Sequence, residues 1–229
     1  MRLQSIEGYN ADVDTGTEDV YAAGGDVNFP AAAAATTVVS ASTDDDGSPV
    51  GTGARTVRIT GLNSSFKQIV EDATLNGTGA VTLTNEFLRV LKIEVLTVGS
   101  GGVSAGAISV KHSSTVIGYL EAGINVSRTA AWMADKNYAN HQITGMYGAI
   151  TNAVSNIMTL ALQVRPYGGA WLTKHTMVLH GVYKPSDHWT FDAPVTLAQS
   201  DDVRIRATAG ADNMGIVAGF DTKSSSSPL

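Results

Sequence analysis

The 229-residue chain has no cysteine, few charged residues and no long apolar run. Without cysteine it can form no disulfide framework, no thiolate metal site and no cysteine nucleophile. No stretch approaches the roughly 20 apolar residues that a membrane-spanning helix needs, and the N-terminus lacks the apolar core of a secretory signal. We therefore expect no membrane partner, no secretory route and no thiol chemistry.

Charge is also scarce. Charged residues make up 16% of the chain, whereas soluble domains average roughly 25%. The net charge is −6 and the 15 basic residues are scattered, which argues against a nucleic-acid partner because phosphate binding relies on clustered Lys and Arg. Such a composition favours a protein that hides surface in an assembly, although β-rich folds also use many small, uncharged residues.

The chain does contain segments in which apolar residues recur at every second position. In Ile157–Arg165, Met158, Leu160, Leu162 and Val164 alternate with polar or small residues, as a strand with one buried face requires. About a dozen such segments, parted by Gly, Asn, Asp and Ser, follow one another at the spacing of a sandwich. The pattern predicts an all-β protein, an antiparallel β-sandwich of jelly-roll type over residues 54–222, with a closed barrel as the alternative.

The first 53 residues differ from the rest in their alanine pentad, their acidic run and their many small residues. They hold too little apolar surface to offset the cost of ordering alone. We expect an extended N-terminal arm over 1–53 that packs on a neighbouring subunit, or else an edge strand and a loop. The residues expected to anchor the arm are Val20, Tyr21, Val27, Phe29, Val38 and Val39. The tail, 223–229, is expected to be flexible.

Three patterns invite comparison with reaction or metal sites. Gly102–Gly106 matches the G-x-S-x-G nucleophile motif in letters, but strand-like residues follow where that motif needs a helix. His175 and His180 are five apart on one predicted strand, so they point to opposite faces and cannot share an ion. The run 44–47, Asp-Asp-Asp-Gly, lacks the alternating ligands of a calcium loop and is expected to be a solvated turn. The sequence therefore predicts no catalytic residue, no metal site, no cofactor and no enzyme activity.

Aromatic side chains could instead stack on sugar rings. The candidates are Trp132, Trp171, Trp189 and Tyr167. Aromatic residues in strands more often serve as core or interface anchors, so these residues support glycan binding only as an alternative.

Several motifs resemble those of a family of tailed-bacteriophage virion structural proteins. They are GARTVRITGL (53–62), TLNGT (74–78), TNEFLRV (84–90), GAI (106–108), VRPYG (164–168), RIR (204–206) and AGFD (218–221). The likeness covers roughly residues 51–221 and leaves out the N-terminal 50.

The resemblance implies a particle component without catalytic residues, made in the cytoplasm of the bacterial host and located in the virion. We expect a head decoration or cement protein that forms a homo-oligomer, with a trimer favoured, and contacts the major capsid protein or other virion proteins. The alternative is a fibre, spike or tail component that binds a host surface glycan.

Overall fold

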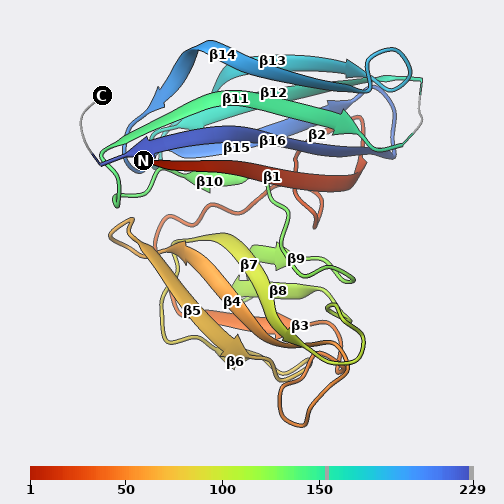
Figure 1. The fold of residues 1–229 in the computed structure, drawn as a ribbon, viewed down its shortest axis with the longest axis vertical. Helices are drawn as coiled ribbons and strands as arrows, with labels where there is room; N and C mark the ends of the chain where they lie inside the picture. The colour runs from red at the N-terminus through yellow and green to blue at the C-terminus, as the bar shows by residue number, and fades with distance from the viewer. Residues whose placement is uncertain (153–154, 227–229) are drawn as a thin grey trace. The chain divides into compact units, whose positions relative to one another are not determined.

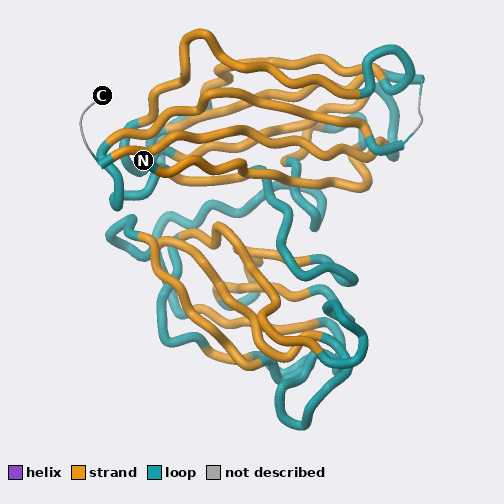
Figure 2. The backbone as a smooth tube through the Cα atoms, in the orientation of Figure 1, coloured by secondary structure: helices purple, strands orange, loops and turns teal. Residues whose placement is uncertain are grey.

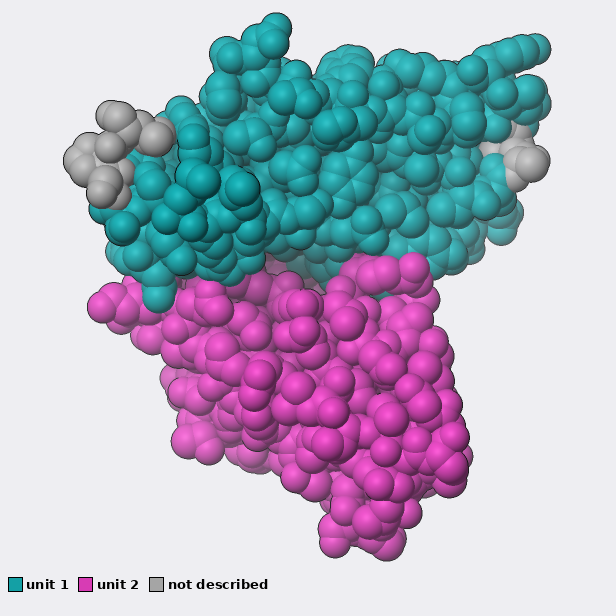
Figure 3. Space-filling model, viewed as in Figure 1, with its two compact units in different colours: residues 1–27, 129–229 teal, residues 28–128 magenta. Residues whose placement is uncertain are grey.

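The computed structural model describes residues 1–152 and 155–226, and the chain divides into two compact units, Met1–Val27 with Thr129–Leu229 and Asn28–Arg128 (Figure 3). Every regular element in the described residues is a β-strand (Figures 1 and 2). The expected all-β class is therefore confirmed. In the same residues, no helix is long and apolar enough to cross a membrane.

Unit 1 (residues 1–27 and 129–229) is a sandwich of two antiparallel sheets (Figure 1). One sheet has the order β1-β16-β11-β14 and the other β10-β15-β12-β13. Its strands are β1 (Arg2–Val13), β2 (Thr17–Asp19), β10 (Ala131–Met133), β11 (Asn140–Ile150), β12 (Ile157–Arg165), β13 (Leu172–His180), β14 (Ser186–Leu197), β15 (Asp202–Ala209) and β16 (Met214–Ser225). This alternation of strands between two sheets is the jelly-roll order.

One edge strand of this jelly roll is made of two pieces. β2 pairs with Arg206–Thr208 of β15, and β10 pairs with Asp202–Arg204 of the same strand. Between the two pairings, Tyr21 and Thr129 form an isolated bridge. The 101 residues of unit 2 (Asn28–Arg128) are therefore inserted in the middle of one strand, at a point where the chain leaves and returns side by side, as a tolerated insertion requires.

The alternation seen in the sequence fills the core of unit 1. Along β12, the side chains of Met158, Leu160 and Leu162 are fully buried, and Val203 and Ile205 of the paired strand β15 are buried with them. Burying side chains of this size contributes about 1.5–3 kcal/mol each. The two-residue period in the sequence therefore predicts correctly which side chains of these strands are buried.

Unit 2 has its own two sheets, β6-β3-β8-β9 and β5-β4-β7. Its strands are β3 (Thr36–Ser40), β4 (Ala54–Leu62), β5 (Gln68–Thr74), β6 (Val81–Thr82), β7 (Arg89–Val98), β8 (Ile108–His112) and β9 (Thr115–Leu120). Val57, Ile59, Phe87, Ile93 and Ile108 lie at the centre of a separate hydrophobic core. A core of its own makes unit 2 a second β-domain.

The division of the chain thus differs from the expected arm, sandwich and tail. Residues 1–53 are not an arm: β1 and β2 belong to the jelly roll, and β3 belongs to unit 2. The predicted sandwich at 54–222 combines parts of both units. Residues 223–225 of the predicted tail continue β16, where Lys223 and Ser224 pair with β1 and Ser225 pairs with β11, while residues 227–229 lie outside the described residues.

Candidate functional site

The expected arm anchors mostly serve the interior of their own units. Val20 and Tyr21 are buried in unit 1, and Val38 is fully buried in the core of unit 2. These three side chains cannot anchor a neighbouring subunit, because their apolar surface is already covered. Val27, Phe29 and Val39 are half-buried, and a role in subunit contacts stays a prediction for them.

The four aromatic candidates do not form a common platform. Trp132 is only 2% exposed, so neither of its faces can receive a sugar. The ring of Trp171 has two guanidinium groups stacked over it, Arg165 at 4.4 Å and Arg204 at 4.1 Å from the ring centroid, and a sugar would have to compete with them for the ring. Trp189 and Tyr167 remain exposed, and sugar stacking stays a prediction for these two.

The serine and histidine candidates contribute hydrogen bonds and packing contacts within the fold. Ser104 is buried and its hydroxyl donates to the carbonyl oxygens of Glu121 and Ile124 at 3.2 and 2.8 Å. The ring of His175 stacks on Phe191 at 3.9 Å, whereas His180 accepts from backbone amides of the next turn. In the described part of the chain, no group of three or more acidic or histidine side chains is placed to hold a metal ion.

The acidic run is not the solvated turn expected from the sequence. Asp45, its middle carboxylate, is fully buried in unit 2. It accepts hydrogen bonds from the Ser40 hydroxyl and from the amides of Ala54, Ala105 and Gly106, at 2.6 to 2.8 Å. Buried polar groups require such partners, so Asp45 joins three segments of unit 2. Asp44 is exposed.

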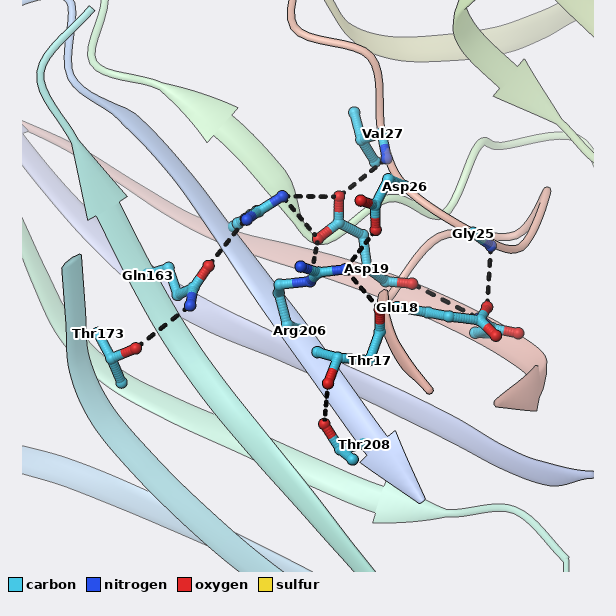
Figure 4. A network of polar contacts seen from close by, with 12 residues as sticks. Thr17, Glu18, Asp19, Gly25, Asp26, Val27, Gln163, Thr173, Arg206 and Thr208 are labelled. Carbon is cyan, nitrogen blue, oxygen red and sulfur yellow. Dashed lines mark hydrogen bonds and ion pairs between the residues drawn. The ribbon is translucent and has the colours of Figure 1, made fainter. Parts of the chain in front are cut away.

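A polar network holds the segment 17–27 to the outside of β15 (Figure 4). The Asp19 carboxylate lies 3.4 Å from both Arg204 and Arg206, and its other oxygen accepts from the Val27 amide at 2.8 Å. Arg206 also pairs with Asp26 and donates to the Thr17 carbonyl. This network fixes the chain where it leaves the jelly roll for unit 2.

Burial dominates the electrostatics of this network. It raises the pKa of Asp19 to about 6, even though Arg204, Arg206 and the Val27 amide act in the opposite direction. Burial likewise lowers the pKa of Arg204, against the effect of Asp19. The two ion pairs are long and Asp19 Oδ1 accepts no hydrogen bond among the described residues, which explains why desolvation is not compensated.

A second polar group lies on the outer face of the sheet β1-β16-β11-β14, and all four strands contribute to it. We call it the outer-face cluster: Ser5, Glu7, Tyr147, His188 and Asp221. Ser5 pairs with Asp221 across the sheet, and Tyr147 pairs with His188. Sheet register alone therefore places these side chains on one face.

Tyr147 is the centre of the outer-face cluster. Its hydroxyl is 2.9 Å from the Ser5 hydroxyl and donates to Glu7 at 3.3 Å. His188 Nε2 lies 3.7 Å from an Asp221 oxygen. Burial raises the pKa of the Tyr147 phenol, and the negative charges of Glu7 and Asp221 add to the shift, against the Ser5 hydrogen bond.

A surface cavity of about 380 Å³ adjoins the cluster and is lined by Leu3, Gln4, Ser5, Thr144, Asp221 and Thr222. Ser5 and Asp221 are the members of the cluster that line this cavity. A concave site with convergent polar groups is the usual form of a small-ligand site. The sequence could not reveal this group, because its members lie up to 216 positions apart and share no local motif.

No protein-family model and no curated protein matches the chain. Among solved structures, the infectious bursal disease virus VP2 subviral particle is 8% identical, with a TM-score of 0.27 over 98% of this chain and 72% of that chain. The Gt and Gx strains of that virus give TM-scores of 0.26 and 0.28 at 10% identity, covering 96% and 98% of this chain and 71% and 72% of theirs. TM-scores of this size do not indicate a shared arrangement of the whole chain, so a function has to be argued from the chain's own features.

Proposed function

We propose that this protein is a structural component of a virus particle, and specifically a decoration protein on the head of a tailed bacteriophage. The observation that carries the proposal is the jelly-roll order of unit 1, an architecture that recurs in viral capsid proteins but also in lectins and cupins. Because a fold does not determine a function, the resemblance over roughly residues 51–221 supplies the choice among these classes.

Self-association fits one face of the jelly roll particularly well. The outer face of the sheet β10-β15-β12-β13 has an uncharged patch where the middle of β12 and β13 adjoins the end of β15, with Arg206 beside Ala161 and Arg165 at the end of β12 on the same face. It carries Thr159, Ala161, Thr176, Val178 and Thr208, with Ile157 at its border. Ile157 and Val178 are 47% and 48% exposed. The cores of protein interfaces are depleted of charge in the same way, so we assign this face, rather than an N-terminal arm, to contacts between copies of the chain in a trimer.

Two measurements test the proposal. Light scattering after size-exclusion chromatography should give the mass of an oligomer, with a trimer expected, and purified phage heads should contain the protein. A monomer that is also absent from the heads would contradict the proposal.

Substitutions test whether the proposed face, rather than another part of the surface, mediates self-association. Val178→Glu should weaken self-association without unfolding the jelly roll, because it places a charge in the centre of the contact. Val70→Glu is the matched control, since Val70 is 47% exposed on β5 of unit 2. Equal effects of the two substitutions would rule out the assignment of the face.

A further inference from the structure

We propose that the outer-face cluster and its cavity form a binding site for a saccharide. The site differs from the four aromatic candidate positions, and it does not depend on the virion role. Two features support it: the kinds of polar group that the sheet brings together and the space beside them.

The site offers both acceptors and donors of hydrogen bonds. Glu7 and Asp221 are acceptors, while the hydroxyls of Ser5 and Tyr147 can act in either sense. Lys223 lies on the same face of β16, two residues from Asp221. A sugar hydroxyl both donates and accepts, so a ligand that carries several hydroxyls matches this mixed set.

A simple cation fits less well. A cation such as an alkylammonium ion can donate hydrogen bonds but cannot accept them. It would also be repelled by the positive charge of Lys223, which no ion pair in the described residues joins to Glu7 or Asp221. A simple anion would meet the two carboxylates. The charges therefore favour a neutral polyol over either ion.

The cavity and the aromatic ring supply the remaining requirements. A volume of about 380 Å³ is within the range of small-molecule sites. Tyr147 is half-buried, and its phenol lies over Gly219, where a Cβ would come within 2.4 Å of the hydroxyl oxygen. A ring fixed in this way and open on part of its surface can pack against the C–H groups of a sugar while its hydroxyl is held in place.

The test uses the whole chain and saturation-transfer NMR with the methyl glycosides of glucose, galactose, mannose and N-acetylglucosamine. At least one of them should bind, with a Kd of about 1 mM. Glu7→Gln and Asp221→Asn should each weaken that binding about tenfold, as the loss of a charged hydrogen-bond partner does. Tyr147→Phe should weaken it less, because the ring remains.

Asp192→Asn is the matched control. Asp192 is an exposed carboxylate in β14, a strand of the same sheet, and its substitution should leave binding unchanged. Thermal unfolding of each variant checks that the fold is kept. The proposal is overturned if no glycoside binds, if the Glu7 and Asp221 variants bind as the parent does, or if ethylammonium chloride displaces the signal and binds more tightly than any glycoside.

Discussion

Gly8 lies against the carbonyl oxygen of Val20 so closely that a Cβ on Gly8 would come within 2.2 Å of that oxygen. The same Cβ would meet the amide nitrogen of Ala130 at 2.4 Å. Val20 and Ala130 hydrogen-bond to each other at the point where the split edge strand is rejoined. Gly8 thus allows β1 of one sheet to approach the interrupted strand of the other.

Replacing Gly8 with alanine should therefore destabilise unit 1. Backbone atoms cannot move aside as a flexible side chain can, so we expect a loss of about 3 kcal/mol in the free energy of unfolding. Urea denaturation measures the change. Gly16→Ala is the control, since a Cβ at Gly16 would meet nothing within 4 Å, and similar losses in the two variants would contradict the explanation.

Asp45→Ala should destabilise unit 2 selectively. The substitution leaves two buried amides, the partly buried amide of Ala105 and one hydroxyl without their acceptor, at a cost of about 3 kcal/mol or more. Hydrogen exchange should accelerate in β3, β4 and β8 but not in β12 or β15. Asp44→Ala, which changes the exposed neighbour, should leave exchange in both units as it is; uniform acceleration in the Asp45 variant would disprove a local role.

The raised pKa of Asp19 predicts a pH dependence of stability. The folded state holds a proton on Asp19 up to about pH 6, whereas the ordinary value is 3.8. Between pH 4 and pH 6, folding is therefore coupled to the uptake of a proton by Asp19. The contribution of the protonated Asp19 to stability is lost as the pH rises through this range. The change is on the order of 3 kcal/mol.

Asp19→Asn isolates this contribution from other titrating groups. The stability of the parent relative to the variant should fall between pH 4 and pH 6.5 in urea denaturation. A relative stability that rises over this range would mean that Arg204 and Arg206 outweigh burial and that the pKa is lowered instead.

Removing residues 28–128 and joining Val27 to Thr129 through a short Gly-Ser linker should leave a folded jelly roll. The bridge between Tyr21 and Thr129 already brings the chain shortly before the insertion next to the chain that follows it, and the buried residues of unit 1 form a core of their own. Circular dichroism and a cooperative thermal transition would show this. An insoluble or unstructured product would mean that the jelly roll needs the insertion in order to fold.

The sequence predicted strands best where one face is buried and apolar. The alternation at Met158, Leu160 and Leu162 is visible without any structure, because apolar and polar neighbours contrast. The sequence does not predict β1 as a strand, because its inward positions include Arg2, Gln4 and Gly8. Polar or small residues at these positions give no apolar period. Tertiary pairing with β16, rather than local pattern, makes this segment a strand.

The insertion and the outer-face cluster could not be read from the sequence for a different reason. β2 and β10 become one edge only because both pair with β15, and the intervening 101 residues look no different from other strand-rich segments. Glu7 and Asp221 likewise come to one face of the sheet through register. Such relationships are set by long-range pairing, which a single sequence does not display.

The split edge strand also determines how the protein would respond to pulling. A force on unit 2 reaches the jelly roll through Val27 and Thr129, and from there the two halves of the edge run in opposite directions along β15. Their hydrogen bonds would be loaded one after another from the junction outward, as in unzipping, instead of together, as in shear. The edge of β15 would give way before the core, and the ion pairs of Asp19, placed beside the junction, would be among the first contacts to bear the tension.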